Sequence, residues 1–205
     1  MAYRDAQAAY RRLLAMAQRQ GSYITARQAR KAGFGYSHLA YHVGAGNIER
    51  AGHGLYRLPE VPRSLHDQLV RLVLWSRGRD DRPQAVVSHD TALALHELSD
   101  ALPTRVHLSV PPGFRKRAPR GCMLHPARLA DDDTEPWEGL RVTAPLRTLV
   151  DLADEGRFGR EQLGRAVEDA LARGLLRRGQ LEAALREPGA PSTRARLGEA
   201  LPARR

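Results

Sequence analysis

The sequence has almost no cysteine and no long apolar run, and each absence excludes a class of protein. Cys122 is the single cysteine among 205 residues. An intramolecular disulfide framework and a cysteine-rich zinc module are therefore excluded. No uninterrupted apolar stretch of about 18 residues, the length that spans a bilayer, occurs in the chain. The first residues also lack the apolar core of a secretory signal peptide, so we expect a cytoplasmic protein that does not contact a membrane.

Lysine and aromatic residues are also scarce. Lys31 and Lys116 are the two lysines, so arginine supplies nearly all of the 33 basic side chains. Aromatic residues make up 5% of the chain and hydrophobic residues 42%, which is enough for a folded core built mainly from Leu, Ala and Val. The net charge of +10 is weak support for nucleic-acid binding by itself, because a GC-rich coding sequence also enriches arginine and alanine.

The position of the charge is more informative than its total. Residues 1–60 hold nine basic and three acidic side chains, whereas residues 61–205 hold 24 and 20. A strongly basic module is thus followed by a nearly balanced body. This asymmetry indicates that the N-terminal part contacts a polyanion.

The N-terminal part has the pattern of three helices followed by a hairpin. Apolar spacing predicts helices over residues 5–20, 26–31 and 36–45. Thr25 and Gln28 form a capping-box pattern at the start of the second helix. Gly52 and Gly54 separate two short segments that can pair as strands. This order predicts a winged helix-turn-helix, with a three-helix bundle and an unrelated hairpin as the alternative.

The remaining residues alternate between predicted helices and short strands. We expect an α+β fold overall, with a winged helix-turn-helix domain over residues 1–60 and a mixed α/β domain over residues 61–187. The second domain is expected to hold a small sheet and C-terminal helices. Residues 188–205, which are rich in proline, arginine and alanine, are expected to form a flexible tail.

Two sets of segments carry a resemblance to a known family. The first set is Ile24-Thr25, Gly33, Leu39, Val43 and Gly54-Leu55-Tyr56-Arg57. The second set is Val87-Ser88-His89, the segment from Val106 to Pro111 and the segment from Val142 to Ala153. Over roughly residues 8–186 the sequence resembles the AbiEi antitoxin family, the first set its N-terminal winged-helix domain and the second set the body that follows that domain.

The resemblance implies an operator-binding antitoxin of a type IV toxin–antitoxin (abortive-infection, phage-defence) system that represses its own operon. Its functional partner would be a nucleotidyltransferase toxin, with direct contact left open. Longer relatives append an endonuclease-like domain of Vsr type, and the sequence match ends before such a domain. This leaves open whether the chain is a complete antitoxin or a shortened relative.

The candidate DNA contacts come from the winged helix-turn-helix. The N-terminal residues of a recognition helix reach base edges in the major groove of double-stranded DNA. Phosphate contacts are expected from the second helix and the wing, where solvated surface charge is the alternative for each arginine. About five neutralised phosphates give a slope of roughly −4 to −5 for log K against log salt. The candidate residues are Tyr36, Ser37, His38, Tyr41 and His42 on the recognition helix, Thr25, Arg27, Arg30 and Lys31 on the second helix, and Arg50, His53 and Arg57 on the wing.

A basic loop in the second part is a possible further contact with nucleic acid or a partner protein. It contains Arg115, Lys116, Arg117 and Arg120. A second functional class therefore stays open, in which the chain is a protein- or RNA-binding module that neutralises a toxin without sequence-specific DNA binding.

No pattern in the sequence favours an enzyme, a cofactor or a metal site. Ser88-His89-Asp90 are consecutive and cannot converge as a catalytic triad, so we expect Ser88 to cap a helix. Cys122, His107 and His125 lack motif spacing for a metal and are expected to pack in the core. Asp131-Asp132-Asp133 is expected to be a solvated acidic loop. Neither lysine follows an acidic residue by two positions, as a restriction-type nuclease requires, and no phosphate-binding P-loop occurs.

Overall fold

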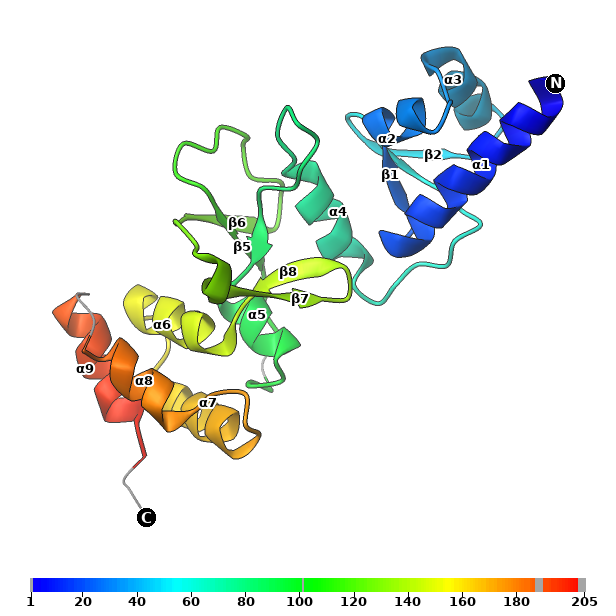
Figure 1. Cartoon of the computed structure of the whole chain (residues 1–205). Helices are drawn as coiled ribbons and strands as arrows, with labels where there is room; N and C mark the ends of the chain where they lie inside the picture. Colours follow the sequence, from blue (N-terminus) through cyan, green and yellow to red (C-terminus); the bar gives the residue numbers. More distant parts are fainter. Residues whose placement is uncertain (1, 101, 187–189, 203–205) are drawn as a thin grey trace. The chain divides into compact units, whose positions relative to one another are not determined.

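Glycine stops and side-chain caps divide the N-terminal part of the chain into short elements. A computed structural model describes residues 2–100, 102–186 and 190–202 of the chain, and Figure 1 shows their secondary structure. Two compact units form. The first comprises Met1–Ala85 with Glu138–Leu140, and the second comprises Val86–Trp137 with Arg141–Arg205. No described helix has the length and apolarity that a membrane span requires.

The first unit has the winged helix-turn-helix order. Its elements are α1 (Ala2–Arg19), β1 (Tyr23–Thr25), α2 (Ala26–Lys31), α3 (Tyr36–Gly44), β2 (Glu49–Gly52) and β3 (Leu55–Arg57). The three strands form an antiparallel sheet in the order β1-β3-β2. The three helices and the hairpin were predicted from the sequence, and the fold is confirmed. Strand β1 was not predicted, because three residues are too few to show an alternating pattern.

The predicted capping box at α2 is confirmed. The Thr25 hydroxyl accepts a hydrogen bond from the backbone N–H of Gln28, and the Gln28 side chain accepts one from the backbone N–H of Thr25. Behind it, the core of the unit joins α1 to the sheet through Leu13, Ile24, Ile48 and Leu58, all of them fully buried. The helices of the helix-turn-helix are therefore held in place by a buried hydrophobic core.

The first unit continues beyond the boundary that was predicted after residue 60. Helix α4 (Asp67–Trp75) belongs to it. The Tyr23 hydroxyl on β1 donates a 2.9 Å hydrogen bond to Asp67, and Leu69 and Val70 are buried. The apolar face of α4 thus packs within the first unit, a contact between distant segments that local sequence patterns do not reveal.

The second unit is built on a five-stranded sheet in the order β6-β5-β4-β8-β7. The strands are β4 (Val86–Val87), β5 (Val106–Val110), β6 (Cys122–Pro126), β7 (Thr134–Trp137) and β8 (Leu140–Thr143). Strand β4 pairs antiparallel with β5 and parallel with β8, and β5 pairs parallel with β6. A small sheet was predicted for this unit, and its strands run in mixed directions. The predicted acidic loop is instead a short 3-10 turn, Asp131–Asp133, that leads directly into β7.

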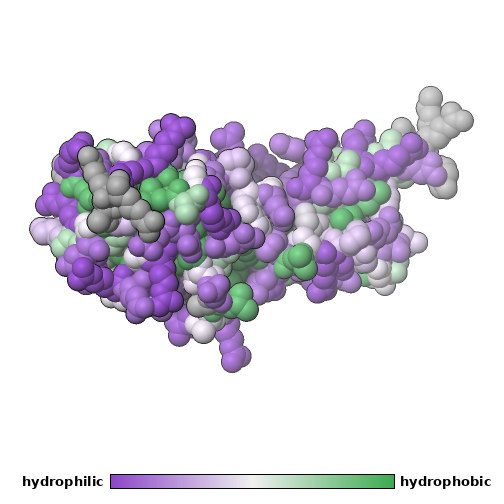
Figure 2. Space-filling view, turned by 90° about the horizontal axis from the view of Figure 1, so that it is seen from below, coloured by the Kyte–Doolittle hydropathy of each residue, from purple (hydrophilic) through white to green (hydrophobic). Residues whose placement is uncertain are grey.

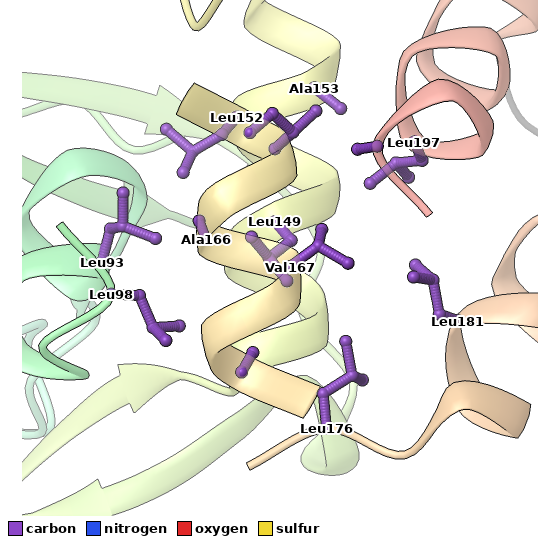
Figure 3. Packing of buried hydrophobic residues seen from close by; sticks show 13 residues of the cluster. Leu93, Leu98, Leu149, Leu152, Ala153, Ala166, Val167, Leu176, Leu181 and Leu197 are labelled. Atoms are coloured by element: carbon purple, nitrogen blue, oxygen red, sulfur yellow. The ribbon is translucent and has the colours of Figure 1, made fainter. Parts of the chain in front are cut away.

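The helices of the second unit pack around α6. They are α5 (His89–Leu95), α6 (Pro145–Glu155), α7 (Arg160–Ala172), α8 (Arg178–Ala184) and α9 (Pro191–Ala200). Figure 3 shows Leu149 and Leu152 of α6 facing Val167 of α7 and Leu197 of α9. Burial of these leucines provides the main hydrophobic stabilisation of the unit.

Two expectations for the second unit are corrected. Residues 191–200, expected to be part of a flexible tail, form α9, because Leu197 and Ala200 are buried against α6 and α7. Proline at the start of α9 is compatible with a first helical turn. Ser88 occupies the N-cap position of α5, but its side chain makes no capping bond. Its hydroxyl lies 2.9 Å from Nδ1 of His89 instead.

Candidate nucleic-acid interface

Helix α3 presents its N-terminal residues to solvent. Tyr36 is 81% exposed and Tyr41 is 70% exposed, and Ser37 and His38 are also exposed. Leu39 is 3% exposed and anchors the opposite face in the core. The helix is capped by Gly35 without a side-chain hydrogen bond, so its first backbone N–H groups stay available to an acceptor. This face can enter a major groove without rearrangement of the helix.

The C-terminal turn of α3 is held in place by aromatic contacts. The ring of His42 lies 5.3 Å from Phe34 and 6.2 Å from Tyr10, measured between centroids. Its Nδ1 is 3.3 Å from the side-chain nitrogen of Asn47. His42 therefore orients the helix against α1, and its predicted base contact competes with this structural role. Tyr41 packs edge-on against His42 and remains exposed.

Helix α2 carries three basic side chains, which differ in whether another group of the protein already binds them. Arg30 and Lys31 are exposed, and no carboxylate within the described ranges pairs with either. Arg27 is exposed as well, and its guanidinium donates a 3.0 Å hydrogen bond to the backbone carbonyl of Arg79. Arg30 and Lys31 are thus the best placed of the predicted phosphate ligands on α2.

The prediction that Thr25 contacts DNA is wrong. Thr25 is 1% exposed, and its hydroxyl is fully used. It accepts from Gln28 and donates to the carboxylate of Asp81. The same feature that marked Thr25 in the sequence, its position as helix cap, removes it from the surface.

Two of the three residues predicted to contact DNA from the wing lie on the surface. Arg50 on β2 and His53 at the turn are exposed. Arg57 on β3 is 9% exposed, so its predicted phosphate contact is wrong. Its guanidinium donates to Glu49, at 3.0 Å, and to the carbonyl of Val61. Residues 49 and 57 are opposite each other in the β2–β3 pair, and this register turns Arg57 into a cross-strand ion pair.

Two residues that the sequence reasoning missed hold the wing turn. The Arg77 guanidinium donates to the carbonyls of His53 and Gly54 at 2.9 and 2.8 Å. It also pairs with Asp81 at 3.0 Å, which accepts from Thr25. A polar chain therefore links the cap of α2 to the turn of the wing through residues beyond α4. The (i, i+4) spacing of Arg77 and Asp81 was a visible signal, but their partner is more than 20 residues away in sequence.

The basic loop of the second unit connects β5 to β6. Arg115, Lys116, Arg117 and Arg120 are all exposed. Strands β5 and β6 are parallel neighbours, so the chain must cross from one end of the pair to the other, and this crossover carries the four basic residues. Their contact with nucleic acid or a partner protein stays a prediction.

Cys122 lies apart in its chemistry from the two histidines considered with it as metal ligands. Burial raises the pKa of the Cys122 thiol to about 11, so this cysteine stays protonated and is a poor metal ligand at neutral pH. His107 and His125, by contrast, lie side by side and contact each other through ring nitrogens 3.1 Å apart. Burial lowers the pKa of both rings. His89, which was considered only as part of a triad, joins them, its ring stacked on His125.

Comparisons with known families cover both units. The family described as a transcriptional regulator, AbiEi antitoxin, matches residues 11–59. The family described as the AbiEi antitoxin C-terminal domain matches residues 84–203. The two matches follow each other without overlap and include the winged helix-turn-helix in one and the five-stranded sheet with its helices in the other.

The fold also has a counterpart among solved structures. The crystal structure of the RV2827C protein from Mycobacterium tuberculosis superposes with a TM-score of 0.57 and 21% sequence identity, over 94% of this chain and 77% of that one. At this identity the likeness concerns the fold alone. A search among curated proteins found no match to the chain.

Proposed function

The chain belongs to the AbiEi antitoxin family, and from this premise we propose that it is a non-enzymatic, sequence-specific repressor that binds double-stranded DNA at its own operon. In this proposal it acts in the cytoplasm as the antitoxin of a type IV system, and a nucleotidyltransferase toxin is its functional partner. An antitoxin and regulator role follows from the family itself. The operator, autoregulation and the toxin are the parts proposed here.

The exposed N-terminal turn of α3 is the observation that carries the proposal. It presents hydroxyl, imidazole and phenol groups, and α3 contains no lysine, arginine or carboxylate. Hydrogen-bonding groups without net charge suit the reading of base edges. The neighbouring cations Arg30, Lys31 and Arg50 suit the phosphate backbone, whose contacts set position and affinity. In this proposal, uncharged groups on α3 read the base sequence, and cations on other elements bind the phosphate backbone.

The test is binding to the DNA upstream of the chain's own gene, measured by fluorescence anisotropy against a scrambled duplex of equal length. We expect preference for the upstream duplex and a steep loss of affinity with salt. Four phosphate contacts, from Arg27, Arg30, Lys31 and Arg50, give a slope of about −3.6, and each contact from the loop between β5 and β6 would add about −0.9. Equal affinity for both duplexes contradicts sequence-specific repression and favours the alternative, a module that neutralises a toxin by binding protein or RNA.

A further inference from the structure

Four titratable side chains of the second unit form a continuous chain of contacts. Nδ1 of His125 lies 3.4 Å from Glu155, its Nε2 lies 3.1 Å from Nδ1 of His107, and Nε2 of His107 lies 3.4 Å from Asp90. His107 is 3% exposed. The chain runs from α6 through β6 and β5 to α5, so it connects four elements of the fold.

The two contacts at the ends of this chain are long. The N···O distances from His125 to Glu155 and from His107 to Asp90 are both 3.4 Å, longer than a typical charge-assisted hydrogen bond. Two neutral imidazoles carry two N–H protons for the three contacts. A third positive charge, on a proton or on a metal ion, would fill the remaining contact.

The gap between His125 and Glu155 has the third ligand that a metal requires. The His89 ring stacks on His125 with centroids 3.6 Å apart. One donor atom from each of His89, His125 and Glu155 lies within 4.8 Å of the other two. Tetrahedral zinc with Zn–N bonds of about 2.0–2.1 Å places neighbouring ligand atoms about 3.3 Å apart. The His125–Glu155 distance of 3.4 Å matches this edge already. The His89 ring must turn out of its stack on His125, from which it deviates by 18°, to direct a lone pair at the same ion.

The backbone at His89 supports a role for its side chain. Its φ is +52°, in the left-handed region that is costly for a residue with a Cβ. Glycine would adopt this angle without strain, so the histidine carries a conformational cost at this position. The ring is 5% exposed, and its Nδ1 contacts the Ser88 hydroxyl. A proton on Nδ1 leaves Nε2 as the ligand atom.

We propose that His89, His125 and Glu155 bind one Zn²⁺ ion and leave a fourth coordination position open. Two imidazoles and a carboxylate are a donor set that zinc uses with an open position. The two remaining protons then occupy the other gaps, from His125 Nε2 to His107 and from His107 Nε2 to Asp90. His107 would then accept the N–H of the metal-bound His125, and Asp90 would orient His107 in turn, as groups outside the ligand shell orient a metal-bound histidine. His107 and Asp90 are thus positioning residues and not ligands.

Charge and access are consistent with an ion at this site. Arg157 lies 2.7 Å from Glu155 and 3.7 Å from Asp90. With neutral histidines the two carboxylates and this guanidinium sum to one negative charge, which a divalent cation reverses. Side chains of His125 and Glu155 are 15% and 19% exposed, so an ion can reach the ligands from solvent.

The experiment uses the full chain, purified without a histidine tag and stripped of metal by a chelator. Zn²⁺ is titrated in competition with a chromophoric chelator, and Co²⁺ is added separately as a spectroscopic probe. We expect one Zn²⁺ per chain, a rise in Tm on binding, and visible Co²⁺ absorption without a thiolate band, because Cys122 is not a ligand.

Variants assign the ligands. Glu155→Gln keeps the size of the side chain and is expected to abolish stoichiometric binding. His107→Gln is expected to weaken Zn²⁺ binding by about 10- to 100-fold, as for other groups that orient a ligand. His53→Gln, at the exposed wing, is the control and should bind as the wild type does. Circular dichroism of each metal-free variant checks that it is folded.

Three outcomes overturn the proposal. The wild-type chain binds no stoichiometric Zn²⁺, or folded Glu155→Gln and His107→Gln bind it with wild-type affinity, or NMR of the imidazole rings shows an imidazolium in the cluster that persists when Zn²⁺ is added. The third outcome would assign the missing charge to a proton.

Discussion

At the scale of single residues, exposure separates candidates that the sequence could not distinguish. Arg50 and Arg57 are both arginines on the wing, but one is exposed and the other is 9% exposed and paired with Glu49. Their positions in the β2–β3 register decide the difference. The sequence identifies the residue types that can contact DNA, whereas the strand register determines which of them reach the surface.

Ser37 and His38 are expected to determine operator preference. Ser37→Ala or His38→Ala removes a hydrogen-bonding group on α3, so binding to the upstream duplex should weaken by about fivefold or more, corresponding to about 1 kcal/mol. Binding to a scrambled duplex should change little. Anisotropy titrations with both duplexes measure the two effects. Arg30→Ala is the control that weakens both, and an equal loss on both duplexes for Ser37→Ala would assign it to backbone contact.

The two wing arginines are expected to behave oppositely. Arg57→Ala leaves Glu49 without its partner and opens a buried position, so the free energy of unfolding should fall by about 1–3 kcal/mol. Arg50→Ala should change it by less than about 0.5 kcal/mol and weaken DNA binding instead. Urea denaturation and salt-dependent binding distinguish these effects. Similar stability of both variants would mean that the Arg57–Glu49 pair contributes nothing.

Asp151 is expected to make stability depend on pH. Burial raises the pKa of this carboxyl group on α6 to about 6, against an ordinary value of 3.8, and its Oδ2 has no hydrogen-bond partner among the described residues. The folded state therefore holds this proton more tightly than the unfolded state does. The stabilisation is complete below about pH 3.8 and is lost as pH rises through 6.

Replacement of Asp151 by asparagine measures this contribution. The stability of Asp151→Asn relative to the wild type should rise by up to about 3 kcal/mol between pH 4 and pH 7. Urea denaturation at several pH values gives the difference. Asp169→Asn, at an exposed position of α7, controls for the loss of a surface charge. A difference independent of pH would mean that the Arg147 guanidinium, 2.8 Å away, keeps Asp151 charged throughout.

At the scale of elements, the sequence predicted what depends on local patterns. The three N-terminal helices, the hairpin and the capping box at Thr25 followed from apolar spacing and caps. Strands β1 and β7 and helix α9 did not. Two of these are strands of three and four residues, and α9 is helical because Leu197 and Ala200 are buried by α6 and α7. Elements that form through tertiary packing leave a weak local pattern.

The wing is expected to depend on Arg77, outside the predicted domain boundary. Arg77→Ala removes the donors to His53 and Gly54, so the turn should open more readily. The backbone N–H of Ala26, which donates to Gly54, should exchange with solvent about tenfold faster, equivalent to about 1.4 kcal/mol. Hydrogen exchange followed by NMR detects this. Arg79→Ala, an exposed neighbour, should leave the exchange rate unchanged, and an unchanged rate in Arg77→Ala would show that the turn is held by the strands alone.

At the scale of the whole molecule, hydrophilic side chains predominate on the face that Figure 2 shows. Hydrophilic residues cover most of the face in Figure 2, and hydrophobic ones form small separate patches. The combination of a basic first unit and a nearly neutral second unit was visible in the sequence. The grouping of His89, His107, His125 and Glu155 was not, because these residues come from four elements that only the folded sheet and helices bring together.

The loop between β5 and β6 is expected to add affinity without selectivity. Replacing Arg115, Arg117 and Arg120 by alanine should weaken binding to upstream and scrambled duplexes alike, and the salt slope should become shallower by about 0.9 for each lost phosphate contact. Replacement of Arg160, Arg165 and Arg186 removes the same charge from exposed positions elsewhere and is the control. If both triple variants bind equally, the loop makes no contact with DNA.

The absence of lysine and arginine from α3 has a consequence for how such a repressor can diverge. In the proposed function, the phosphate contacts come from residues on other elements, so substitutions on the exposed face of α3 would change the preferred operator while the overall affinity for DNA persists. Duplicated genes would thereby acquire different operators through few substitutions, and each protein would no longer bind the operator of the other.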